Sequence, residues 1–191
     1  DQNAFELAVD TILHAKHIYI IGIRSCAPLA SFMAFYFTLM FPNVHLIQTS
    51  SSSEIFEQMV RIGKEDVIIG ISFPRYSMRT LKAMEFANNR SAKVITLTDS
   101  VHSPMNLYSS CNLIADSDMA SIVDSLVAPL SVINALIVAL CMKKQNEVAK
   151  TLEMLEDIWD EYQVYENDEI NYIDDSIKMR YGKVGDAELY E

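Results

Sequence analysis

The sequence has few cysteines, and none is placed for a disulfide framework or a zinc site. Its three cysteines (Cys26, Cys111 and Cys141) are widely spaced, and the four histidines form no ligand spacing with them. An odd number of isolated cysteines is typical of reduced, buried thiols and therefore of a cytoplasmic protein. No signal-peptide pattern opens the chain. We expect neither a metal nor a cofactor.

Clusters of lysine and arginine are also missing. Residues 151–191 hold thirteen acidic and three basic residues, a net charge of −10, which leaves only −1 of the total of −11 for the first 150 residues. Because a nucleic-acid surface needs clustered positive charge, neither part is expected to touch DNA. Any DNA contact must come from another segment, and a chain that begins at Asp1 is compatible with a piece of a longer protein.

No apolar run reaches the length of a membrane span. The candidate is residues 118–142, predicted as one apolar-rich helix, but Asp124, Ser131 and Asn134 interrupt it. Pro129 should kink this helix or mark its true start. A buried helix, or one at a dimer interface, is favoured over a membrane helix, so we expect no membrane contact.

The sequence does contain apolar strands that alternate with helical patterns. Strands are expected at residues 17–23, 44–48, 67–73, 92–97 and 111–115. Helices are expected between them, one of which should end at Gly63. This alternation predicts an α/β fold, a flavodoxin-like doubly wound five-stranded parallel sheet flanked by helices. We expect one such domain over residues 1–145 and an acidic C-terminal helix and tail over residues 146–191. Residues 167–191 should be disordered or ordered only by a partner.

Residues 67–80, VIIGISFPRYSMRT, are the most informative stretch of the chain. A buried strand ends there in a polar turn that opens a helix, and parallel sheets bind ligands at such strand ends. The helix N-terminus favours an anion, and hydroxyls at Ser72, Ser77 and Thr80 could donate to it. Ser77 could equally be a plain helix cap, so this turn alone leaves both readings open.

Two other predicted strands end in similar polar residues. Arg24 and Ser25 follow the first strand, and the second is followed by Thr49 and four serines that include Ser51. Hydroxyls bind an anion without titrating, and arginines supply positive charge. Serines also fill loops for conformational reasons alone. Three such ends at one edge of a sheet nevertheless favour a phosphate or sugar-phosphate pocket.

Three motifs resemble a known family. GIRS at residues 22–25, SFPRYSMRT at 72–80 and ITLTDSVHSP at 95–104 are similar to the SIS, or sugar isomerase, domain, and in particular to the effector domain of RpiR/MurR-type transcriptional regulators. The resemblance covers about residues 5–144. It implies a domain that binds phosphosugars and forms a homodimer or a higher homo-oligomer, with a helix-turn-helix module expected before Asp1. It also implies that four hydroxyls hold the phosphate: Ser25, Ser72, Ser77 and Thr80.

The chain departs from the family pattern in both loops. Many members have a second glycine in the first loop, where this chain has Ile23 or Arg24. Many SIS enzymes have serine and glycine where Pro74 and Arg75 stand.

The preferred function is therefore a phosphosugar-binding sensor domain of a transcriptional regulator. The ligand-binding residues are predicted to be Arg24, Ser25, Ser51, Ser72, Arg75, Tyr76, Ser77 and Thr80.

Two other functions stay open. The first is an aldose–ketose sugar-phosphate isomerase, with Glu54 or His102 as the base. Glu54 could instead serve only the dipole of the following helix. The second is a dimerisation module with a vestigial pocket. No nucleophile–base pair, Walker pattern or metal cluster is visible in the sequence.

Overall fold

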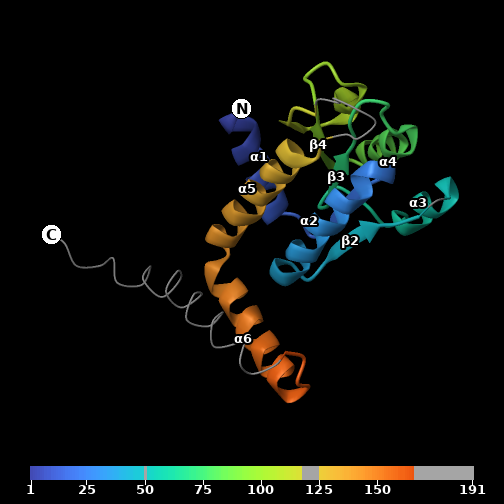
Figure 1. Ribbon diagram of the computed structural model, residues 1–191. Helices are drawn as coiled ribbons and strands as arrows, with labels where there is room; N and C mark the ends of the chain where they lie inside the picture. Colours follow the sequence, from blue (N-terminus) through green and yellow to red (C-terminus); the bar gives the residue numbers. More distant parts are fainter. Residues whose placement is uncertain (50, 118–124, 166–191) are drawn as a thin grey trace. The chain divides into compact units, whose positions relative to one another are not determined.

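The computed structural model describes residues 1–49, 51–117 and 125–165, which form a parallel sheet flanked by helices (Figure 1). The chain divides into two compact units, Asp1–Val148 and Ala149–Glu191. The first unit contains the five strands in the order β2-β1-β3-β4-β5, all parallel. The strands are β1 (Ile18–Gly22), β2 (Val44–Ile47), β3 (Val67–Ile71), β4 (Lys93–Thr98) and β5 (Cys111–Ile114). The expected doubly wound fold is confirmed.

Continuous apolar runs explain the two central strands. Every residue of β1 (IYIIG) and of β3 (VIIGI) is buried, as is typical of strands covered by helices on both faces. The chain runs outward from β1 to β2, returns to β3 on the other side of β1, and continues to β5. The direction of winding therefore reverses between β1 and β3.

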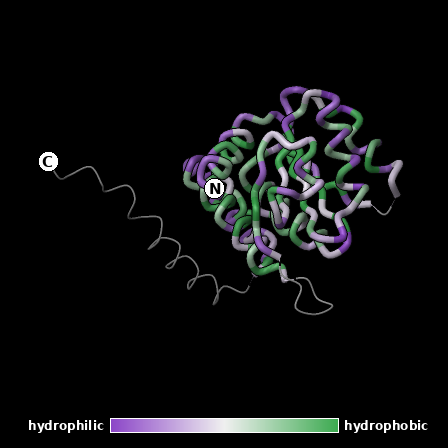
Figure 2. Tube along the Cα trace, turned by 90° about the horizontal axis from the view of Figure 1, so that it is seen from above, coloured by the Kyte–Doolittle hydropathy of each residue, from purple (hydrophilic) through white to green (hydrophobic). Residues whose placement is uncertain are grey.

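Helices cover both faces of the sheet. α1 (Gln2–Leu13), α2 (Ala27–Met40) and α5 (Val127–Lys143) share one core with Ile20 and Ile69. α3 (Ser52–Gln58), α4 (Met78–Asn89) and the 3₁₀ helix η2 (Pro104–Tyr108) share a second core with Ile21 and Ile68. Hydrophobic residues are concentrated on the inner segments, whereas hydrophilic residues lie mainly on the outer loops (Figure 2). A short 3₁₀ helix, η1 (Arg24–Cys26), joins β1 to α2.

The predicted long helix is partly described as α5. It begins at Val127 with Pro129 in its first turn, where proline is tolerated, so the alternative that Pro129 marks the start fits the described residues. Residues 118–124 of that prediction lie outside the described part. Among the described residues, no single helix is long and apolar enough to cross a membrane. Only α5 and α6 (Gln145–Glu161) taken together pass that test, and the chain bends between them.

α6 follows α5 and crosses the division between the two units at Val148. Its helical structure agrees with the sequence pattern, and Leu152, Leu155 and Trp159 are half-buried. The predicted domain boundary at residue 145 stays a prediction. The predicted disorder of the acidic tail falls on residues outside the described part.

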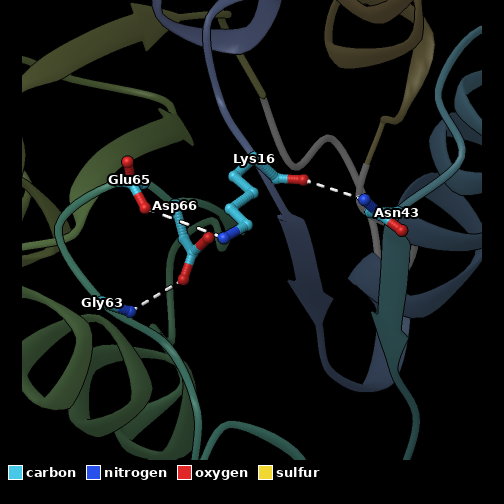
Figure 3. Close-up of polar contacts among 5 residues, drawn as sticks. All are labelled: Lys16, Asn43, Gly63, Glu65 and Asp66. Carbon is cyan, nitrogen blue, oxygen red and sulfur yellow. Dashed lines mark hydrogen bonds and ion pairs between the residues drawn. The ribbon is translucent and has the colours of Figure 1, made fainter.

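The expectation that a helix ends at Gly63 is wrong. α3 ends at Gln58, and Gly63 does not adopt a positive φ. Its N–H instead donates to Asp66 Oδ2 at 2.8 Å (Figure 3). The Asn43 amide donates to the Lys16 carbonyl at 3.3 Å. These contacts hold the loops at the amino edge of the sheet, opposite the predicted site.

Candidate functional site

The carboxyl ends of β1 and β3 lie side by side at the point where the winding reverses. Gly22 at the end of β1 is paired with Ile71 at the end of β3. The loops that follow, Arg24–Cys26 and residues 72–77, therefore start from neighbouring strands. In doubly wound sheets, ligands bind in the crevice at this reversal. The structure thus brings together the first and third of the predicted polar strand ends.

Two serines shape the loop between β3 and α4. The Ser72 side chain is buried, and its Oγ accepts the Ser77 N–H at 3.0 Å. Ser77 is the N-cap of α4, and its Oγ accepts the Thr80 N–H at 3.3 Å. The capping role considered for Ser77 is therefore confirmed. A serine hydroxyl that accepts a hydrogen bond keeps its own hydrogen, so both can still donate to an anion.

The side-chain hydroxyl of Thr80, at the start of α4, lacks a hydrogen-bond partner among the described residues. Its side chain is completely buried in the first turn of α4. All other buried side-chain oxygen and nitrogen atoms in the described part of the chain have a hydrogen-bond partner, and Thr80 Oγ1 does not. An unsatisfied buried hydroxyl costs about 1–3 kcal/mol, so it requires an explanation. A ligand oxygen at the N-terminus of α4 would provide one.

Arg24 and Arg75 both adopt the left-handed backbone conformation, with φ of 59° and 64°. Glycine occupies this region without strain, whereas other residues rarely do. Both loops therefore have the backbone conformation that glycine would favour, although both positions hold arginine. Strained residues of this kind cluster at functional sites, and these two lie in the loops on either side of the reversal.

Tyr76 ties the loop after β3 to the end of β4. Its hydroxyl donates to the Asp99 carboxylate, at 2.9 Å to Oδ1 and 3.2 Å to Oδ2. The Thr98 hydroxyl also donates to Asp99, at 3.1 Å. Burial, followed by the bond to Asp99, raises the pKa of the Tyr76 hydroxyl. Asp99 was not selected from the sequence, although it follows β4 directly, as the other polar residues follow their strands.

Replacing Tyr76 by phenylalanine should therefore loosen this loop. We expect Tyr76→Phe to lower the free energy of unfolding by about 1 kcal/mol, a typical net value for one hydrogen bond. Asp99→Asn should act on the same contact, so the double variant should lose less than the sum of the two single variants. Urea denaturation of the four proteins measures this coupling. Additive losses would show that the Tyr76–Asp99 contact does not hold the loop.

The loop after β2 has its own internal contacts. Ser51 precedes α3, and its Oγ lies 2.8 Å from Ser53 Oγ. The Thr49 hydroxyl donates to the Glu54 carboxylate. Glu54 lies in the first turn of α3, where a negative charge also complements the helix dipole.

The remaining predicted residues are exposed. Arg24 and Ser25 lie at the start of η1 and are open to solvent. His102 is exposed in the loop before η2, where its backbone N–H donates to Ser100 Oγ at 3.2 Å. Across the described ranges, no three histidine, cysteine, aspartate or glutamate residues are grouped to hold a metal ion.

The fold and site define a doubly wound α/β domain in which hydroxyl-bearing loops follow β1 and β3 at the reversal of its sheet. The chain belongs to the SIS domain family, whose model matches residues 11–139. It is 27% identical over 159 residues to an uncharacterized HTH-type transcriptional regulator of Caldanaerobacter subterraneus subsp. tengcongensis. That alignment covers 79% of this chain and 55% of the relative, so the chain spans about half the length of the curated relative that it matches.

Solved structures share the fold. The sugar isomerase domain of an RpiR transcription factor from Sphaerobacter thermophilus superposes with a TM-score of 0.78 at 23% identity, covering 82% of this chain and 87% of that one. The Vibrio vulnificus NanR protein complexed with ManNAc-6P gives a TM-score of 0.72 at 18% identity, covering 83% of this chain and 62% of that one. Structures described as sugar-phosphate isomerases have the same fold.

Proposed function

We propose that this chain is the phosphosugar-binding sensor domain of a transcriptional regulator. The observation that carries the proposal is the buried, unsatisfied hydroxyl of Thr80 in the first turn of α4. A phosphate at this helix end would accept the Thr80 hydroxyl and would gain from the dipole of the helix. The domain family and the regulator among its relatives agree with such a role.

The phosphate would sit over the loops that follow β1 and β3. Ser72 and Ser77 can each donate a hydroxyl hydrogen there. Ser25 lies at the start of η1, in the loop after β1. Arg75 would add positive charge from the loop after β3. Arg24, in the loop after β1, would contact another part of the same ligand. Ser51 and Tyr76 would lie further out, where they shape the loops after β2 and β3.

A homodimer is part of this proposal. α2 and α5 pack against each other, yet they expose large apolar side chains, with Phe35 62%, Val138 57% and Met142 74% exposed. An apolar surface on two packed helices suits a second copy of the chain. A ligand that binds one dimer arrangement better than another would shift the population between them. In a full regulator, that shift would reach a DNA-binding module outside this chain.

The rival function is a sugar-phosphate isomerase, because some solved structures with this fold are described as such enzymes. Its base would be Glu54 or His102. Glu54 lies in the first turn of α3, which follows β2, and His102 lies in the loop after β4, so both are at the carboxyl edge of the sheet. The Glu54 carboxylate accepts the Thr49 hydroxyl, a contact that favours a local structural role.

A panel of sugar phosphates tests the sensor against the enzyme. At a hundred times its dissociation constant, a true ligand should stabilise the protein by about 2.7 kcal/mol, which a thermal shift readily detects. The free sugar and inorganic phosphate should each give much smaller shifts. NMR of the incubated ligand should show no isomer, since a sensor binds without turnover.

Two variants sharpen this experiment. Ser72→Ala removes the acceptor of the Ser77 N–H and should abolish most of the ligand-induced shift. Ser131→Ala removes an exposed serine of α5, outside the site, and should leave the shift unchanged. If no sugar phosphate raises the melting temperature of the wild type, the sensor proposal is wrong. Isomer formation that disappears in Glu54→Gln would instead establish the enzyme.

A further inference from the structure

A cavity of about 200 Å³ lies next to the proposed phosphate site, at the carboxyl ends of β1 and β2. Its wall is mostly apolar and includes Ile21, Leu46 and Ile55. Its polar lining comes from Arg24, Gln48 and Thr49. Arg24 is the charged residue among the described residues that line the cavity. The position beside β1 puts the cavity within the reach of a ligand whose phosphate is held over β1 and β3.

The backbone of Arg24 gives a second, independent reason to expect a function there. Its φ of 59° is left-handed, a conformation that is strained for a non-glycine residue. Glycine would adopt this conformation without that strain. No hydrogen bond or ion pair to the Arg24 side chain is found within the described residues. The side chain therefore does not offset the strain by stabilising the fold through such contacts.

The surroundings of Arg24 favour an anionic group. Glu54, which directly precedes the lining residue Ile55, does not itself line the cavity, and its carboxylate accepts the Thr49 hydroxyl. The Gln48 amide donates to Ser31 Oγ at 3.2 Å and keeps a further N–H. The Arg24 guanidinium can form two parallel charge-assisted hydrogen bonds to an anionic group.

We infer that this cavity is a second subsite, which takes a carboxylate group of the bound phosphosugar. The inference rests on the proposed function and narrows its ligand class to phosphorylated sugar acids. The planar guanidinium of Arg24 matches the two oxygens of a carboxylate, a geometry that a hydroxyl or an aldehyde cannot provide. Arg24 is then a specificity-determining residue, while the hydroxyls of the loop after β3 hold the phosphate.

Paired ligands test this subsite. Calorimetry would measure binding of five- and six-carbon aldose phosphates, each compared with the aldonic acid phosphate of the same configuration. We expect at least one acid to bind the wild type tenfold or more tightly than its paired aldose. In Arg24→Gly this ratio should fall to about one, because affinity for the acid falls more than affinity for the aldose. Arg24→Lys keeps the charge without the planar fork and should retain part of the preference.

The stability of the variants separates binding from folding. Arg24→Gly removes the left-handed strain, so its melting temperature should equal or exceed that of the wild type. Ser91→Gly is the matched control, because Ser91 is also left-handed, with φ of 65°, but lies at the turn after α4. It should leave the ratio of affinities unchanged.

The other possible results contradict either the carboxylate subsite or the sensor proposal. Equal affinity of the wild type for every acid and its aldose would refute the carboxylate subsite and leave the sensor proposal standing. An equal loss for both ligands in Arg24→Gly would mean that Arg24 serves the phosphate, which also refutes the subsite. If none of the sugar phosphates binds, the proposed function itself fails.

Discussion

Thr80→Val is expected to stabilise the ligand-free protein and to weaken phosphosugar binding. Valine has nearly the same shape as threonine but has no hydroxyl to leave unsatisfied in the buried first turn of α4. The free energy of unfolding should rise by about 1 kcal/mol, because the cost of the unpaired hydroxyl disappears. Loss of a hydrogen bond to a charged phosphate, worth about 1.5–3 kcal/mol, should weaken binding roughly 10- to 150-fold. Urea denaturation and calorimetry measure the two effects.

Thr96 provides the matched control for this experiment. It is equally buried, but its hydroxyl lies 2.8 Å from Asn106 Oδ1 and 3.1 Å from Asn112 Oδ1. Thr96→Val should therefore destabilise the protein by about 1–3 kcal/mol, the opposite sign to Thr80→Val. If Thr80→Val loses stability in the same way, or binds the ligand as tightly as the wild type, the Thr80 hydroxyl is not a ligand contact.

Gly22→Ala is expected to destabilise the protein and to disturb the first loop of the site. A Cβ at this position would lie 2.6 Å from the Cys26 carbonyl oxygen and 3.1 Å from Ala30 Cβ. Because a backbone atom cannot swing aside as a side chain does, η1 and the start of α2 must shift. Overpacking of this kind costs about 1–3 kcal/mol. Ligand affinity should fall with stability, because the same shift moves Arg24 and Ser25.

Gly63→Ala is the control for this prediction, since a Cβ there would meet no atom within 4 Å and the backbone φ is not positive. This variant should be neutral or gain about 0.4–1 kcal/mol through a less flexible unfolded chain. Chemical denaturation of both variants gives the comparison. Equal stability of Gly22→Ala and Gly63→Ala would show that the contact between β1 and η1 can relax freely.

Some of the site could be predicted from the sequence because it depends on local pattern. Residues 67–80 alone predict a buried strand that ends in hydroxyls and opens a helix, and the structure joins β3 to α4 there. Ser77 was expected as a cap or a ligand contact, and its capping bond to Thr80 is present. The end of α3 was misjudged because glycine marks several kinds of turn, and Gly63 bonds to Asp66 instead.

Other features of the site depend on residues that are distant in the sequence. The bond from Tyr76 to Asp99 spans 23 residues and exists only because β3 and β4 are neighbours. The left-handed conformations of Arg24 and Arg75 oppose the local preference of arginine, so no propensity rule could have found them. The unsatisfied state of Thr80 is a property of everything packed around it.

The sequence by itself determined the five strands, their parallel arrangement and the edge of the sheet that carries the polar residues. Apolar runs and their polar ends are local signals, because burial on both faces of a sheet demands unbroken hydrophobic stretches. Only the tertiary structure decided which hydroxyl lacks a partner, which arginine lines a cavity and which glycine has no room for a side chain. Those properties arise from packing between segments, and the free energy of such contacts is not encoded in any single stretch of the chain.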